Sequence, residues 1–146
     1  MSAFLGNAWG RRTEQILEWE IQLIEVQSKR MKLEGILSKF VEIGDVEGVA
    51  IVTKDGLLVA SRLPREVDSG VFSAMTAAMH AAGETAINEL KRGSCQIVSA
   101  ESESNMILAY SLDSIRILVA LFKSHTNLGL VRVELLRTAD ELKVLL

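Results

Sequence analysis

Two uninterrupted apolar runs constrain the fold of this chain most strongly. Residues 49–52 read Val-Ala-Ile-Val, and residues 117–122 read Ile-Leu-Val-Ala-Leu-Phe. A strand with one face in water alternates apolar and polar residues, whereas a strand covered on both faces stays apolar throughout. The two runs therefore predict strands buried on both faces, with helices on either side of the sheet. This architecture is a three-layer α/β/α sandwich.

Three further apolar segments bring the number of predicted strands to five. Residues 57–60 follow the first run after Asp55-Gly56, a pair that favours a two-residue type I′ hairpin turn. Residues 95–100 and 106–111 precede the last strand, which is expected over 115–122. Short polar loops separate these three segments, so they predict an antiparallel meander.

Helices are expected before, between and after these strands. Residues 11–43 contain no proline and a single glycine, which predicts one long helix or two helices nearly end to end. A second helix is expected over 68–91, with Asp68 or Ser69 as its N-cap. Residues 127–146 repeat apolar side chains at helical spacing and predict the last helix.

The first predicted helix, whose start Thr13 is expected to cap, carries two apolar stripes. Spacings of four and three place one set of residues on a seam that Arg30 interrupts: Trp19, Leu23, Val26, Leu33, Leu37 and Phe40. A second stripe lies beside it: Leu17, Ile21, Ile24 and Met31. Both stripes need burial against the same domain, another copy or a partner. We expect an N-terminal helical extension at 1–30 and a domain at 31–146, with helix contacts through Trp19, Leu23, Val26 and Leu33.

The helix expected over 68–91 is rich in alanine and methionine. Met75, Ala78, Met79 and Ala82 belong to a surface of small or flexible side chains that lets another backbone approach closely. Packing on the chain's own sheet and pairing with a second helix both remain open from the sequence.

Composition and charge argue against several classes of function. The 19 acidic residues outnumber the 16 basic ones, which argues against nucleic-acid binding because phosphates attract clusters of basic residues. The apolar runs fall far short of the about 20 residues that span a membrane. One cysteine excludes an internal disulfide and indicates a reducing compartment. The first twelve residues lack the apolar core of a secretory signal, so a cytoplasmic protein is expected.

The search for catalytic residues favours a binding protein. The sequence has no Gly-x4-Gly-Lys-Ser/Thr phosphate loop, and neither His80 nor His125 has companion ligands at metal-site spacing. His80 is therefore expected at the surface or in an interface. Cys95 stands among apolar residues, as is typical of an inert buried thiol. Glu101 and Glu103 lie in a serine-rich loop and are expected to be solvated. We expect a noncatalytic scaffold that needs no cofactor and no metal.

From about Met31 to Leu146 the chain resembles the Roadblock/LC7 family, including its MglB-like members. The hairpin and the alanine-rich helix that follows it carry the resemblance as a set. The matching segments are Leu33–Leu37, Val46–Val52, Asp55–Ser61, Phe72–Ala82 and Ile115–Leu121.

The resemblance implies a five-stranded antiparallel sheet of order 2-1-5-4-3. The central helix covers one face, and the first and last helices cover the other. Members of the family are homodimers or heterodimers in which the central helices pair and the third strands meet. Carried over by position, the dimer interface contains Met75, Ala78, Met79 and Ala82 of the helix and Cys95, Ile97 and Ser99 of the third strand.

The resemblance also implies a function, because family members serve as platforms for small Ras-like GTPases or as dynein-associated light chains. The leading hypothesis is a noncatalytic dimeric scaffold that binds and regulates a small Ras-like GTPase. Its partner chain is a second copy or another Roadblock-type chain, and the catalytic residues belong to the GTPase. One alternative is a structural adaptor that the N-terminal helix organises without a GTPase. A profilin-like small-molecule sensor is a further alternative.

Overall fold

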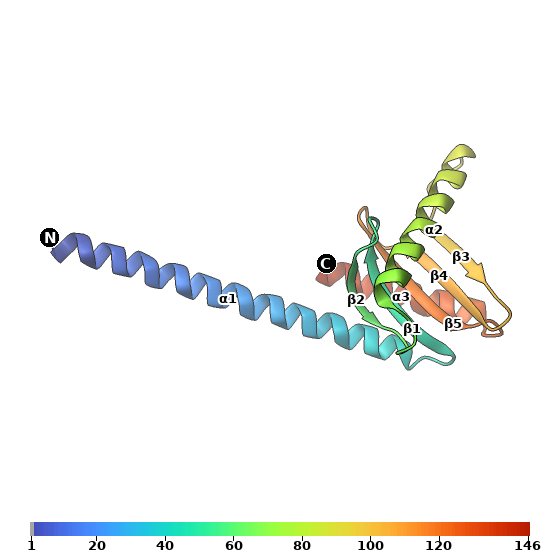
Figure 1. The fold of residues 1–146 in the computed structure, drawn as a ribbon, viewed down its shortest axis with the longest axis horizontal. Coiled ribbons are helices and arrows are strands. Elements are labelled where there is room, and N and C mark those ends of the chain that lie inside the picture. Colours follow the sequence, from blue (N-terminus) through green and yellow to red (C-terminus); the bar gives the residue numbers. More distant parts are fainter. Residues whose placement is uncertain (1) are drawn as a thin grey trace. The chain divides into compact units, whose positions relative to one another are not determined.

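A computed structural model describes residues 2–146, with side chains from residue 8 onward. The expectation about a secretory signal therefore falls partly outside the described residues. Within them, three helices accompany one five-stranded antiparallel sheet (Figure 1). The helices are α1 (Ser2–Val41), α2 (Ser69–Glu89) and α3 (Leu128–Leu145). The strands are β1 (Val46–Thr53), β2 (Leu58–Arg62), β3 (Ile97–Glu101), β4 (Asn105–Ser111) and β5 (Arg116–Lys123).

The chain divides into two compact units, residues 1–32 and residues 33–146. The first unit is helical, and the second contains the sheet, α2, α3 and the last turns of α1. The segment expected over 11–43 is one helix rather than two. Thr13 lies inside it and donates its hydroxyl hydrogen to the carbonyl oxygen of Trp9 at 2.9 Å. The prediction that Thr13 caps the helix start is therefore wrong, because that hydroxyl satisfies a helix-interior carbonyl instead.

The sheet has the order β2-β1-β5-β4-β3, and every neighbouring pair is antiparallel. The two strands predicted to be most deeply buried, β1 and β5, are neighbours, with Ala50 opposite Val119. This arrangement confirms the predicted fold class and strand order. It leaves β2 and β3 as the two outer strands of the sheet.

Each face of the sheet has its own core, so the layers follow from alternate residues of the same strands. Val49 and Ile51 of β1 face the core beneath α3 and the end of α1. Ala50 and Val52 face the core beneath α2. All four side chains are fully buried, as the uninterrupted apolar run predicts.

The connection between β1 and β2 differs from the predicted type I′ turn. The N–H of Gly56 donates to the carbonyl oxygen of Thr53 at 2.9 Å, and the N–H of Thr53 donates to that of Leu57 at 2.8 Å. Gly56 has a φ of +93°, whereas Asp55 is not among the described residues with positive φ. This pattern is a three-residue loop, a type I turn followed by a left-handed glycine. The predicted turn type is wrong because one more residue in the loop spares Asp55 a left-handed conformation.

Candidate interaction surface on α2 and β3

Local signals in the sequence set the position of α2. The Asp68 side chain accepts a hydrogen bond from the N–H of Val71 at 3.0 Å, which confirms Asp68 as the N-cap. The helix ends at Glu89, two residues earlier than expected, and Lys91 and Gly93 then take φ values of +55° and +111°. These left-handed residues turn the chain toward β3.

Two glycines bring other segments close to α2. A Cβ atom at Gly83 would lie 3.1 Å from Cγ1 of Val98 on β3, and nearer still to Cγ2. Gly56 of the β1–β2 loop has a positive φ, and a Cβ there would lie 3.2 Å from the Cα of Ala74. Close approach at Gly83 fixes the buried face of α2 against the sheet, so the opposite face of the helix is turned outward.

The outward face of α2 is a continuous, uncharged stripe. Its residues are spaced three and four apart, and all of them are exposed: Val71, Ala74, Met75, Ala78, Ala81, Ala82 and Thr85. We call this set the α2 stripe. Val71 is 59% exposed and Met75 is 61% exposed, so the two largest members present most of their surface to water. The stripe offers a partner helix large side chains near one end and a close approach at its centre.

Strand β3 adds an open sheet edge in the same unit. It pairs with β4, with Ser99 opposite Leu108, and it is an outer strand of the sheet. The side chains of Ser99, Ala100 and Glu101 are exposed. An outer strand presents unpaired N–H and C=O groups along one edge, which a strand from another chain can bind.

The residues expected at the interface fall into two groups. Met75, Ala78, Ala82 and Ser99 are exposed. Met79 is half-buried and packs against the core under α2, while Ile97 packs against the core on the other face. Cys95 is 6% exposed and lies two residues before β3. The first group is available to a partner, and the second shapes the surface from below.

Sequence reasoning missed the groove at one end of this surface. It has a volume of about 410 Å³ and is lined by Ile87, Ser94, Cys95, Gln96, Ile97, Ser99, Leu108, Leu128 and Arg132. These residues come from α2, the loop before β3, strands β3 and β4, and α3. Their separate positions carried no periodic signal that could have grouped them.

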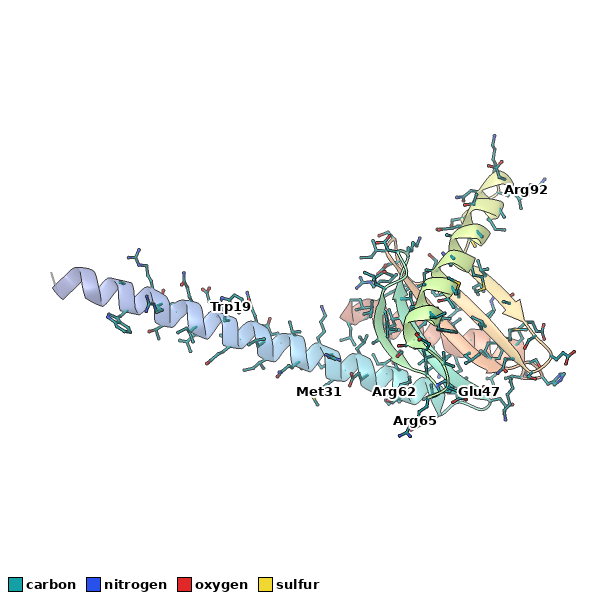
Figure 2. All side chains as sticks on the ribbon, in the orientation of Figure 1. Trp19, Met31, Glu47, Arg62, Arg65 and Arg92 are labelled. Carbon is teal, nitrogen blue, oxygen red and sulfur yellow. The ribbon has the colours of Figure 1, made fainter. Side chains whose placement is uncertain are left out.

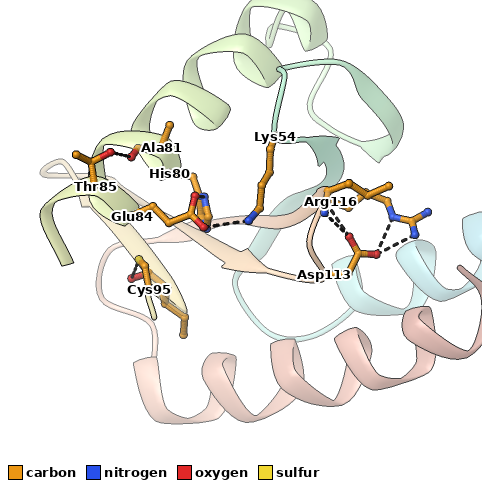
Figure 3. A network of polar contacts seen from close by, with 10 residues as sticks. Lys54, His80, Ala81, Glu84, Thr85, Cys95, Asp113 and Arg116 are labelled. Atoms are coloured by element: carbon orange, nitrogen blue, oxygen red, sulfur yellow. Dashed lines mark hydrogen bonds and ion pairs between the residues drawn. The ribbon is translucent and has the colours of Figure 1, made fainter. Parts of the chain in front are cut away.

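His80 lies under α2 and not at the surface or in an interface, so that prediction is wrong. Its side chain is 1% exposed, because its position on α2 faces the sheet together with Ser73, Thr76 and Ala77. The Nδ1 atom lies 3.7 Å from Oε2 of Glu84, and Nζ of Lys54 lies 3.0 Å from the other carboxylate oxygen, Oε1 (Figure 3). Among the described residues, its Nε2 atom has no hydrogen-bond partner.

Burial shifts the pKa values of two buried side chains, His80 and Cys95. It lowers the pKa of His80, although the Glu84 carboxylate opposes this shift and Lys54 reinforces it. Burial also raises the pKa of the Cys95 thiol, and Glu84 adds to that shift. A neutral imidazole and a protonated thiol agree with packing roles, and the thiol matches the inert group predicted from its apolar neighbours.

The four candidate contact residues of the N-terminal helix differ in burial: three are exposed and Leu33 is buried. Trp19, Leu23 and Val26 are 68%, 55% and 63% exposed. Leu33 is buried in the core of the second unit, together with Leu37 and Phe40. Figure 2 labels Trp19 and Met31, two of the exposed side chains of α1.

Neither of two other kinds of site was found among the described residues. No group of three or more His, Cys, Asp or Glu side chains could hold a metal ion. None of the described helices is both long enough and apolar enough to cross a membrane.

Comparisons with known proteins agree with this fold. The family model of the Roadblock/LC7 domain matches residues 32–122. An uncharacterized protein of Methanocaldococcus jannaschii is 32% identical over 113 residues, which cover 77% of this chain and 98% of that protein. MglB of Myxococcus xanthus has a TM-score of 0.71 at 23% identity, over 76% of this chain and 91% of MglB. A structure of MglB with a tetrameric arrangement has a TM-score of 0.74 at 16% identity, over 80% and 89% of the two chains.

Proposed function

The chain belongs to the Roadblock/LC7 family, and from this premise we propose that it is a noncatalytic dimeric scaffold that binds and regulates a small Ras-like GTPase. The two copies pair through the α2 stripe and the open edge of β3. The dimer then presents one continuous surface to the GTPase. The catalytic groups belong to the GTPase, and this chain positions them or alters nucleotide exchange.

The observation that carries the proposal is the exposed, uncharged face of α2 beside an open sheet edge. Soluble monomers rarely expose large apolar patches, and such patches mark interaction sites. Ala78 lies at the centre of the α2 stripe, and its methyl group lets a second helix approach closely. Pairing of β3 with its copy also removes an open edge that would otherwise invite nonspecific strand addition.

The dimer surface is tested by Ala78→Glu, with Ala78→Ser as the matched control at the same position. A carboxylate at the centre of a close helix contact is buried without a partner, which is strongly unfavourable. We expect Ala78→Glu to raise the concentration at which the assembly dissociates at least tenfold, as measured by sedimentation equilibrium. Serine keeps the small volume and should leave this concentration within a factor of three. Equal dissociation of wild type and Ala78→Glu would refute the α2 interface.

The GTPase is tested by affinity capture with the full chain as bait. Lysate of the source organism is divided into one arm with a nonhydrolysable GTP analogue and one with GDP, and bound proteins are identified by mass spectrometry. We expect one small GTPase to be enriched in one arm over the other. Recovery of non-GTPase proteins equally in both arms would favour the structural adaptor instead.

A further inference from the structure

The first unit of the chain carries an exposed apolar seam that the proposed GTPase platform does not use. We define the α1 seam as Trp9, Ile16, Trp19, Leu23 and Val26. Spacings of seven, three, four and three place these residues on one face of the helix. Their exposed fractions run from 53% to 68%. Every member therefore presents more than half of its surface to water.

The same helical repeat continues into the core of the second unit. Leu33, Leu37 and Phe40 lie on the same face beyond Val26, and all three are buried. One heptad pattern thus runs from Trp9 to Phe40, with Arg12 and Arg30 at two of its positions, and its second half packs against apolar partners. The first half, between Trp9 and Val26, has the composition of a packed face without an apolar partner in the described chain.

The charges beside the α1 seam favour a second copy of this chain as the occupant. In the seven-residue repeat, two positions border the seam, one on each side. Between residues 13 and 29 these bordering positions hold one acid and one base, Glu20 and Lys29, and are otherwise uncharged: Thr13, Gln15, Gln22 and Gln27. Two identical seams can therefore meet without a row of like charges at these flanking positions. Arg12 occupies the seam position between Trp9 and Ile16, and its guanidinium stacks over the Trp9 ring of its own helix, 5.6 Å from the centroid.

The second stripe of the helix is a poorer self-binding surface. Leu17, Ile21, Ile24 and Met31 are equally exposed. However, acids occupy the flanking positions of this stripe at Glu18, Glu20 and Glu25. Parallel pairing of two copies through it would place Glu20 of one helix opposite Glu25 of the other, and like charges at these flanking positions oppose pairing. The charges at the flanking positions therefore favour the α1 seam over the second stripe.

We propose that residues 9–26 bind the same segment of a second copy of this chain through the α1 seam, as a two-stranded coiled coil. This contact is separate from the α2 interface, so each chain has two self-binding surfaces. Burial of the seam stabilises the helix, because most helical stability in proteins comes from packing of an apolar face. It also gives the GTPase platform an assembly element that the matched family segment, residues 32–122, does not contain.

The test uses full-length chains that carry Ala78→Glu, which removes the α2 contact and leaves the helix contact to be measured alone. Leu23→Glu places a charge in the seam, and Ile24→Glu places the same charge at the next residue, on the second stripe. Both side chains are more than half exposed, so neither change disturbs the core of residues 33–146. Circular dichroism checks the fold of each variant, and sedimentation equilibrium gives its mass.

The expected masses are multiples of the 16.0 kDa chain. Ala78→Glu alone should remain a dimer, the double variant with Leu23→Glu should be a monomer, and the double variant with Ile24→Glu should remain a dimer. A monomeric Ala78→Glu chain would overturn the seam proposal and leave the α2 interface intact, with the seam free for a different protein. A dimer that survives Leu23→Glu in the Ala78→Glu chain, or one that Ile24→Glu also dissociates, would overturn it as well.

Failure of the α2 interface gives a different result. In that case Leu23→Glu alone would produce a monomer, and Ala78→Glu would leave the wild-type dissociation unchanged. The seam proposal would then stand while the dimer of the proposed function falls. If both proposals hold, Leu23→Glu alone stays dimeric through α2.

Discussion

The close contact between Gly83 of α2 and Val98 of β3 determines which face of α2 is turned outward, and Gly83→Ala tests this contact directly. A Cβ atom at this position would lie 3.1 Å from Cγ1 and 3.3 Å from Cβ of Val98, and nearer still to Cγ2. Val98 is a β-branched residue in a paired strand, so its side chain has little freedom to rotate away. The helix or the strand must therefore move to accept the methyl group.

Two opposing effects determine how much Gly83→Ala changes the free energy of unfolding. Replacing glycine by alanine inside a helix stabilises it by about 1 kcal/mol. Forcing a carbon atom into a packed contact costs about 1–3 kcal/mol. We therefore expect Gly83→Ala to lower the free energy of unfolding by about 1 kcal/mol, the difference between the middle of that range and the helix gain.

A second glycine and a second substitution supply the controls. Gly35 also lies in a helix of the second unit, but a Cβ there would meet nothing within 4 Å. Gly35→Ala should therefore raise the free energy of unfolding by about 1 kcal/mol. Val98→Ala removes the methyl groups that obstruct Gly83→Ala, so the double variant should be more stable than the sum of the single effects by about 1–2 kcal/mol.

Urea denaturation at one fixed protein concentration measures all four variants, because self-association makes stability depend on concentration. If Gly83→Ala stabilises the chain as much as Gly35→Ala does, α2 does not approach β3 at Gly83. The outward orientation of the α2 stripe would then lose its support.

Three further changes test other parts of the fold. Burial lowers the pKa of His80, so the unfolded chain binds the proton more tightly, and the free energy of unfolding should fall as the pH drops below about 6.5. His80→Leu should reduce this loss of stability, as measured by urea midpoints from pH 7.5 to 5.5. An unchanged dependence of the midpoint on pH would contradict the prediction. Burial alone would raise the pKa of Asp113, but hydrogen bonds from the N–H groups of Ile115 and Arg116 and from the Arg116 guanidinium lower it (Figure 3). Asp113→Ala should therefore cost about 1–3 kcal/mol at neutral pH, with the difference from wild type shrinking below about pH 4. Asp68→Ala should lower thermal stability by about 1 kcal/mol through the lost N-cap, whereas Asp68→Ser should lose less than half of that.

The sheet was predictable because its strongest signals are local. The apolar runs in β1 and β5 predicted burial on both faces, and the side chains of Ala50 and Val119 are indeed fully buried. The N-cap of α2 was predicted as Asp68 or Ser69, because both residue types favour caps, and the structure selects Asp68. The strand order came from the family resemblance rather than from periodicity.

Other features depend on contacts that the sequence does not encode locally. His80 was predicted at the surface or in an interface because it has no companion ligands in the sequence, yet its position on α2 turns it toward the sheet, beside Glu84. Thr13 has a side chain typical of an N-cap, but the helix begins eleven residues earlier, at Ser2, and the Thr13 hydroxyl donates to the carbonyl oxygen of Trp9. The groove around Cys95 joins α2, the loop before β3, β3, β4 and α3, and only the fold brings α3 beside the others.

The most direct test of the regulatory role measures the nucleotide cycle of the GTPase that the bait recovers. Single-turnover GTP hydrolysis and GDP release are followed with and without saturating amounts of this chain, and with the chain alone. We expect the chain alone to hydrolyse no GTP and its addition to change one of the two rates at least tenfold. If both rates stay unchanged while the two proteins remain bound, the chain tethers the GTPase without regulating it, and the account is contradicted.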